Sequence, residues 1–238
     1  MSEPLILHIE TSTNICSVAL SQGRNLLALK ESDEQKAHST LLTVFVDQLL
    51  TEVKRSAEAI DAVCVSKGPG SYTGLRIGVS VTKGLAYGLN VPVIGITSLH
   101  AMARGALDTA LVREHLKNDP GLLLCPMIDA RRMEVYTAFF DKEMNELRPT
   151  HADIIDSESY SGLLRDHKVL FFGNGAFKLK DVVVNDNVIL MEDFHPSARH
   201  MIVPALEAYA RKAFEDTAYF EPFYLKDFIA TTPRKKVL

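Results

Sequence analysis

The feature of this sequence that most limits its fold is a pattern of strands, helix and glycine turn that occurs twice. Each copy begins with a short apolar run that ends at an acid, and each closes with a later strand that runs into a glycine turn. The first copy contains Leu5–Ile9, Glu10 and Gly68–Gly70, and the second contains Leu122–Ile128, Asp129 and Gly173–Gly175. A pattern that repeats on this scale predicts two related α/β domains.

Hydrophobic periodicity divides the two copies into elements. The chain opens with an antiparallel meander of three strands, and the expected strands are 5–9, 15–20, 26–30, 62–65, 91–96, 122–128, 134–140 and 169–172. The expected helices are 38–53, 75–89, 99–116 capped by Ser98, and 197–216 with a kink at Pro204. We expect an N-terminal domain of residues 1–105 and a smaller C-terminal domain of residues 106–238, whose final segment packs back on the first.

The loop from Gly68 to Gly74 is the most informative local motif. A glycine loop between a strand and a helix can aim backbone N–H groups at an anion, but the loop lacks the Gly-Lys-Ser/Thr of a P-loop. A tight structural turn capped by Ser71 or Thr73 fits the spacing as well. Acids at strand ends are commonly turn residues, although Glu10 and Asp129 could hold a magnesium-bound water. The residues that would lie near a nucleotide are Glu10, Ser12, Thr13, Gly68, Gly70 and Ser71.

Two helices of the first copy carry unusual faces. Helix 38–53 has an apolar stripe wider than one sheet face requires. In helix 75–89 and the turn before it, glycines 74, 78, 84 and 88 fall on one side, where we expect close packing against the domain. The opposite side is polar and aromatic, which suits solvent or a partner. The predicted partner surface comprises Leu41, Leu42, Phe45, Leu49, Arg76, Ser80, Lys83 and Tyr87.

Composition excludes several classes of protein. The formal net charge is −4, which gives no electrostatic reason for strong nucleic-acid binding by this chain alone; the one concentrated basic segment, Arg234–Lys236, is expected to be a solvated tail. The cysteines at 16, 64 and 125 have no metal-ligand spacing, so we expect buried thiols and a reducing cytoplasm. No secretory leader or membrane span is expected.

Groupings of catalytic or metal-binding residues are mostly missing from the sequence. Four residues after His38 stands Leu42, so helix 38–53 has no pair of histidines for a metal ion. No nucleophile elbow of the form Gly-x-Ser-x-Gly occurs. We therefore predict no catalytic and no metal-ligating residue in this chain.

Several ordered motifs resemble those of the TsaB family, also called YeaZ. They are Ile6–Thr13, Ser66–Gly78, Lys83–Ala86, Pro92–Gly95, Ile128–Arg131, Glu134–Tyr136 and Pro222–Leu225. The resemblance spans essentially the whole chain and is weakest between about 140 and 195. One departure is Glu10, where many members carry Asp, and the longer side chain puts a water or metal contact at that position in doubt.

The resemblance implies an actin-like, sugar-kinase and Hsp70-like ATPase fold with two related domains, the second reduced. It implies a non-catalytic subunit that dimerises with TsaD, the subunit that transfers a threonylcarbamoyl group to an adenosine of tRNA beside the anticodon. TsaD carries a His-x-x-x-His motif where this chain offers only His38. The resemblance also implies a TsaE-like ATPase as a further partner, tRNA contact only through the complex, and self-association when the chain is alone.

Three functions therefore remain open from the sequence. The first is a scaffold that binds no cofactor tightly, with ATP or ADP and magnesium at a shared subunit interface. The alternative is an ATP-dependent kinase or hydrolase that acts on its own. The third, a metallopeptidase, is disfavoured by the single histidine of helix 38–53.

Overall fold

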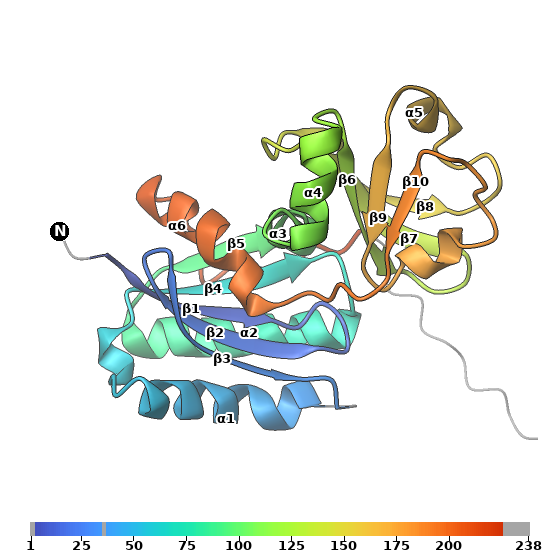
Figure 1. The fold of residues 1–238 in the computed structure, drawn as a ribbon. Coiled ribbons are helices and arrows are strands. Elements are labelled where there is room, and N and C mark those ends of the chain that lie inside the picture. The colour runs from blue at the N-terminus through green and yellow to red at the C-terminus, as the bar shows by residue number, and fades with distance from the viewer. Residues whose placement is uncertain (1–2, 35–36, 226–238) are drawn as a thin grey trace, which may run out of the picture.

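A computed structural model describes residues 3–34 and 37–225 and contains two five-stranded sheets (Figure 1). The strand order of the first sheet is β3-β2-β1-β4-β5, and that of the second, read in the same direction, is β8-β7-β6-β9-β10. The strands are β1 Leu5–Glu10, β2 Cys16–Gln22, β3 Asn25–Ser32, β4 Ala62–Gly68, β5 Val93–Thr97, β6 Leu123–Asp129, β7 Glu134–Phe140, β8 Glu146–Ile154, β9 Val169–Phe172 and β10 Val188–Met191. In each sheet the first three strands are antiparallel and the last two are parallel to the first. The expected fold of two related α/β domains is confirmed.

The helices that connect the strands show why the second domain is the smaller. In the first domain, α1 (Ala37–Glu52) joins β3 to β4, and α2 (Tyr72–Leu89) joins β4 to β5. At the same two places the second domain has only α5 (Ser161–Asp166) and the 3₁₀ turn η2 (Ala176–Leu179). The two long helices of the first domain, of 16 and 18 residues, are thus reduced to 6 and 4 residues in the second.

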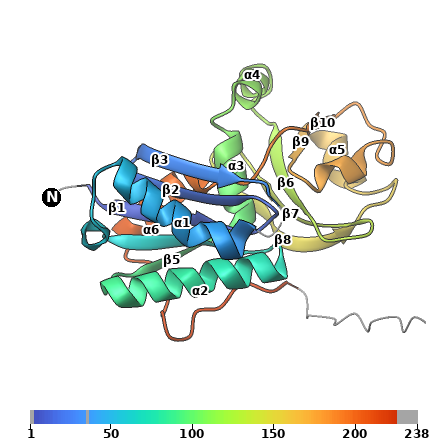
Figure 2. The ribbon, with the colours of Figure 1, turned by 90° about the horizontal axis from the view of Figure 1, so that it is seen from below.

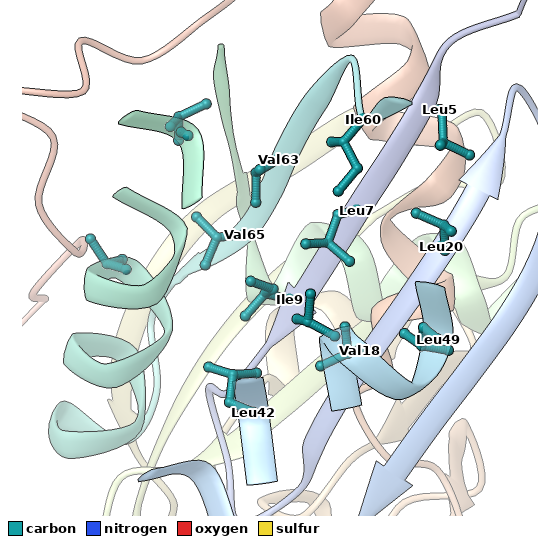
Figure 3. Close-up of a cluster of buried hydrophobic side chains, with 14 of the residues drawn as sticks. Leu5, Leu7, Ile9, Val18, Leu20, Leu42, Leu49, Ile60, Val63 and Val65 are labelled. Atoms are coloured by element: carbon teal, nitrogen blue, oxygen red, sulfur yellow. The ribbon is translucent and has the colours of Figure 1, made fainter. Parts of the chain in front are cut away.

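One face of the first sheet is covered by α1 and α2, which lie beneath it in Figure 1 and in front of it in Figure 2, the view from below. All six residues of β1 are buried, because this strand is central in the sheet and is covered on both faces. Leu7, Ile9 and Val63 point to the helical side, where Leu42 and Leu49 of α1 meet them (Figure 3). This cluster is the main core of the first domain.

The opposite face of the first sheet is covered by segments from later in the chain. Helix α3 (Ser98–Ala106) and the continuous pair η3 (Ala198–Met201) and α6 (Ile202–Ala210) pack there. Small residues allow close contact, and they include Ala19 and Cys64 of the sheet and Ala205 of α6. The first domain is therefore completed by residues that follow the second sheet in sequence.

The helix expected at 99–116 is wrong, because the structure has two helices there. Helix α3 ends at Ala106, and α4 (Ala110–Asn118) begins after Thr109, whose hydroxyl accepts a hydrogen bond from the Val112 N–H. A threonine in this position caps a new helix. Ser98 is the first residue of α3 and Thr97 stands at its N-cap, so the predicted cap is displaced by one residue.

The helix expected at 197–216 is also shorter than predicted. Its α-helical part ends at Ala210, and the chain then extends until the Glu215 N–H donates to the Val93 carbonyl at 2.9 Å. Pro204 lies in the first turn of α6, where backbone N–H groups have no partner within the helix. It therefore removes no hydrogen bond from α6, and the kink expected at this proline stays a prediction.

The three cysteines are free thiols and are fully buried, as expected. Among the described residues, no helix combines the length and apolar character that crossing a membrane requires. The basic tail Arg234–Lys236 lies outside the described residues.

Candidate functional site

Glu10 is the last residue of β1, and its side chain is buried against the turn that follows. Its side chain is 1% exposed, and Oε1 accepts hydrogen bonds from the Ser12 N–H at 2.6 Å and the Ser66 hydroxyl at 2.9 Å. Its other oxygen is buried and has no hydrogen-bond partner within the part of the chain that the structure describes. Burial raises the pKa of Glu10, and the hydrogen bonds from Ser12 and Ser66 oppose that rise. The carboxyl group thus links β1 to β4 and does not face the solvent.

The glycine loop packs directly on the turn that contains Ser12. The Ser71 N–H donates to the Ser12 carbonyl at 2.6 Å, and a Cβ added to Gly70 would meet that same carbonyl. Ser71 also caps α2, since its hydroxyl accepts from the Gly74 N–H at 3.3 Å. Gly68 has a φ of +109°, a conformation that favours glycine. The glycines of this loop therefore allow it to pack closely on the β1–β2 turn.

The glycines of α2 divide into two groups. Side chains at Gly74 and Gly78 would meet Thr11, as the sequence predicted for an inward glycine face. A Cβ at Gly84 or Gly88 would meet nothing within 4 Å, so the prediction was wrong for these two. The reason is the direction of α2, whose stripe of Leu75, Val79, Thr82 and Ala86 faces the sheet and leaves Gly84 on the opposite side.

A cavity of about 600 Å³ lies between the two domains. Its walls come from the β1–β2 turn, the glycine loop, the β6–β7 turn and the end of the described chain. The lining residues are Ser12, Thr13, Asn14, His38, Pro69, Gly70, Ser71, Tyr72, Thr73, Leu75, Ile128, Asp129, Ala130, Arg131, Tyr136, Asn174, Phe223, Tyr224 and Leu225. Of the residues expected near a nucleotide, Ser12, Thr13, Gly70 and Ser71 line this cavity, and Glu10 and Gly68 do not.

Asp129 ends β6 at the edge of this cavity, and its charge is already paired. Its Oδ1 atom accepts hydrogen bonds from the Arg131 N–H at 2.6 Å and from the ammonium group of Lys178. Lys178 comes from η2, is only 6% exposed, and also donates to the Glu134 carbonyl at 2.7 Å. Asp129 and Lys178 therefore form an ion pair within the second domain.

These residues do not fit a magnesium-bound nucleotide. Magnesium in such sites is bound through one or two accessible carboxylates together with the phosphates. Glu10 is buried behind Ser12, which is itself fully buried, and Asp129 holds an ammonium group. Glu10 is thus unavailable, and Asp129, whose side chain is 38% exposed, already shares its Oδ1 atom with an ammonium group.

His38 of α1 has a structural hydrogen bond. Its Nε2 atom lies 3.1 Å from the Ile15 carbonyl, and the residue is almost fully buried at the edge of the cavity. At this distance the ring donates a hydrogen bond from Nε2 to the carbonyl oxygen, which fixes the orientation of the ring. The histidine thus fastens α1 to the β1–β2 turn.

The predicted partner surface is only partly accessible in α1. Leu42 and Leu49 are 1% and 0% exposed and face the sheet, which corrects the prediction for these two side chains. Leu41 and Phe45 are half-buried, and beside them Val44 is exposed. The outer face of α1 is therefore narrower than the sequence pattern suggested, because its wide apolar stripe packs on both the sheet and α2.

In α2, Ser80 and Tyr87 are exposed, while the two basic residues are engaged within the chain. Arg76 lies over the Tyr72 ring, with its guanidinium carbon 4.2 Å from the ring centroid, and its Nε donates to the Tyr224 hydroxyl at 3.1 Å. Tyr87 is 86% exposed, the highest value of any aromatic side chain in the described residues.

Residues 215–225 form what we call the C-terminal strap, which passes beside α2 (Figure 2). Lys83 donates to the carbonyls of Ala218 and Phe220 at 3.0 and 3.2 Å, and Phe220 enters the main core. The Phe223 N–H donates to the Lys67 carbonyl at 2.7 Å. The sequence placed the final segment back on the first domain, but it gave no sign of the extended strap, because the aromatic residues around Pro222 have no periodicity.

Known proteins resemble this chain over most of its length. Residues 31–234 match the family model described as "TsaD: tRNA N6-adenosine threonylcarbamoyltransferase". The chain is 31% identical to "tRNA threonylcarbamoyladenosine biosynthesis protein TsaB" of Escherichia coli K12, over 94% of this chain and 96% of that one. It is 29% identical to the protein of the same name from Bacillus subtilis, over 93% of each.

A solved structure supports the same likeness. It is that of a protein "with similarity to peptidase YEAZ" from Pseudomonas aeruginosa, which is 25% identical in sequence and superposes with a TM-score of 0.79. The superposition covers 94% of this chain and the whole of that one. The likeness therefore extends over both domains.

Proposed function

Because the chain belongs to the TsaB (YeaZ) family, we propose that it is a non-catalytic subunit required for threonylcarbamoyl-adenosine formation in tRNA. In this proposal it binds a TsaD-like catalytic subunit through the outer face of α2 and the adjoining edge of α1. A TsaE-like ATPase joins the pair, and tRNA is contacted only through the assembled complex, which is located in the cytoplasm.

The observation that carries the proposal is the outer face of α2. Tyr87 is 86% exposed beside Gly84 and Gly88, which present bare backbone. An exposed aromatic ring on a smooth helix suits a protein interface, since aromatic residues contribute strongly to interface centres and glycines let another helix approach closely. Ser80 and Leu41 extend the same surface.

The partner is proposed to share this fold, so the same surface can pair two copies of the chain when the partner is absent. In this proposal ATP or ADP with magnesium, when the complex uses them, binds at the shared subunit interface, because Glu10 is buried within the first domain and Asp129 is paired with Lys178. The alternative function, a kinase or hydrolase that acts alone, would require turnover by the isolated chain in the range of about 1 per second.

The test is binding of Tyr87→Glu to the TsaD-like subunit from the same organism, measured by titration calorimetry. We expect the dissociation constant to rise at least about tenfold, because a charge would be buried without a partner. Self-association in sedimentation velocity should weaken as well. Val184→Glu is the matched control, since Val184 is equally exposed but lies in the second domain.

Unchanged affinity of a folded Tyr87→Glu variant would move the interface elsewhere. A separate titration of the wild-type chain with magnesium and ATP tests the alternative. Turnover that is lost in Glu10→Ala would replace the scaffold proposal with an enzyme.

A further inference from the structure

We propose that Lys178 is a built-in cation whose ammonium group occupies the position beside Asp129 that a magnesium ion would need. The proposal rests on the geometry of the second domain and is independent of the partner surface on α2. It concerns one lysine that has no special sequence context and that the sequence analysis did not single out.

The first support is the way Lys178 is buried. A lysine that is 6% exposed requires a partner for its charge, since an unpaired buried ammonium group is strongly unfavourable. Its Nζ atom has two partners, the Asp129 carboxylate and the Glu134 carbonyl. The side chain thus crosses from η2 to both strands of the β6–β7 hairpin.

The second support is competition for the same oxygen. Asp129 Oδ1 already accepts from the ammonium group and from the Arg131 N–H. A divalent ion at this carboxylate would lie within a few ångströms of a fixed positive charge, and like charges at that separation repel strongly where water is partly excluded. Magnesium also demands near-ideal octahedral ligands and keeps several waters, and the ammonium group obstructs that shell.

The third support is that, among the described residues that line the cavity, the first domain contributes no replacement carboxylate. Both oxygens of Glu10 lie below the surface, and Gly70 covers the Ser12 carbonyl. Whether the cavity has a carboxylate that is free to bind a metal ion therefore depends on Lys178.

The ammonium group also has a structural role in the β6–β7 turn. Asp129, Arg131 and Glu134 belong to a tight turn in which Arg131 and Arg132 have φ values of 71° and 50°. These left-handed conformations cost energy for residues other than glycine. The contacts of Lys178 at both ends of the turn hold it in this shape.

The experiment uses manganese ions as the probe of the full-length chain. Bound manganese broadens nearby amide signals in NMR spectra, so weak occupancy can be detected at a known place. In the wild type we expect no selective broadening of residues 129–134. In Lys178→Met, which keeps the length of the side chain and removes its charge, half-maximal broadening there should need at least tenfold less manganese.

The matched control is Lys178→Met combined with Asp129→Asn, which should lose the broadening gained by the single variant. If Lys178→Met is not folded by circular dichroism, Lys178→Gln serves in its place, because its amide can still donate to the Glu134 carbonyl. Selective broadening of residues 129–134 in the wild type would overturn the proposal. So would a folded lysine variant that gains none.

Discussion

Two buried histidines should make the fold sensitive to mild acid. His8 in β1 is fully buried, and its Nε2 atom lies 2.8 Å from the Ser21 hydroxyl. His200 in η3 stacks on Phe194 with the ring centroids 5.0 Å apart. Burial lowers the pKa of His8 to about 3 and that of His200 to about 4. Both rings are therefore neutral in the folded chain at neutral pH.

The sign of the effect follows from which state takes up protons. Below pH 6.5 the unfolded chain binds a proton at each histidine, whereas the folded chain does so only near pH 3 to 4. The contribution of each ring is thus present above pH 6.5 and is lost as the pH falls below it. From pH 7.5 to 5.5 the loss is about 1.4 kcal/mol for each ring, or roughly 3 kcal/mol together.

Glu10 acts in the opposite direction. Burial raises its pKa, so its unfavourable contribution grows as the pH rises through the range above 4.5. Measuring the histidine effect in a Glu10→Gln background removes this opposing term. Gln keeps the oxygen that accepts from Ser12 and Ser66.

The assay is urea unfolding followed by circular dichroism at pH 7.5, 6.5 and 5.5. His8→Gln should reduce the loss of stability between pH 7.5 and 5.5 by about 1.4 kcal/mol, whatever it does to stability at pH 7.5. His151→Gln, at an exposed position on β8, is the control. If His8→Gln shows the same loss between pH 7.5 and 5.5 as its parent, the reasoning from neutral buried rings is wrong.

Three further predictions concern packing. Gly84→Ala should raise the free energy of unfolding by about 0.5–1 kcal/mol, because the added methyl group meets nothing and alanine favours helix. Gly74→Ala should lower the free energy of unfolding, because its methyl group meets the Thr11 carbonyl. The midpoints of urea unfolding of the two variants test both statements. Leu49→Ala should cost about 2–5 kcal/mol by the same assay, whereas Leu147→Ala at an exposed site should change stability by about 0.5 kcal/mol or less. Lys83→Met should release the C-terminal strap, seen as severalfold faster protease cleavage there; an unchanged cleavage rate would show that its two carbonyl contacts are dispensable.

The sheet arrangement was predictable because its signal is local. Strands such as β1 and β6 are short apolar runs that end at an acid, and the repeat of that pattern indicates two similar sheets. The sequence of strand β8 contains no apolar run, because β8 is an edge strand in which polar residues are frequent and Pro149 occurs. The helix at 197–216 was predicted too long because the chain turns at Lys212, whose φ is 54°, and Glu215 then pairs with Val93, a contact that joins distant residues.

The site was harder to predict because its contacts join distant residues. The glycine loop was recognised, but its packing on Ser12 depends on a turn that lies nearly 60 positions earlier. Arg76 was expected on an open face, and its contact with Tyr224 spans 148 positions. Lys178 is one of two lysines in a short polar and apolar segment, and only the fold shows which of them is buried.

The way α6 and the C-terminal strap complete the first domain has a consequence for synthesis on the ribosome. One face of the first sheet lacks Ala198, Met201 and Ala205 until the chain has been translated past α6. From Thr97 to Ala210, at about 5–20 residues per second, this takes roughly 5–20 seconds. During that time the nascent first domain exposes apolar surface, which is the state that chaperones bind. A truncated chain that ends after β10 should therefore aggregate, even though it contains all ten strands.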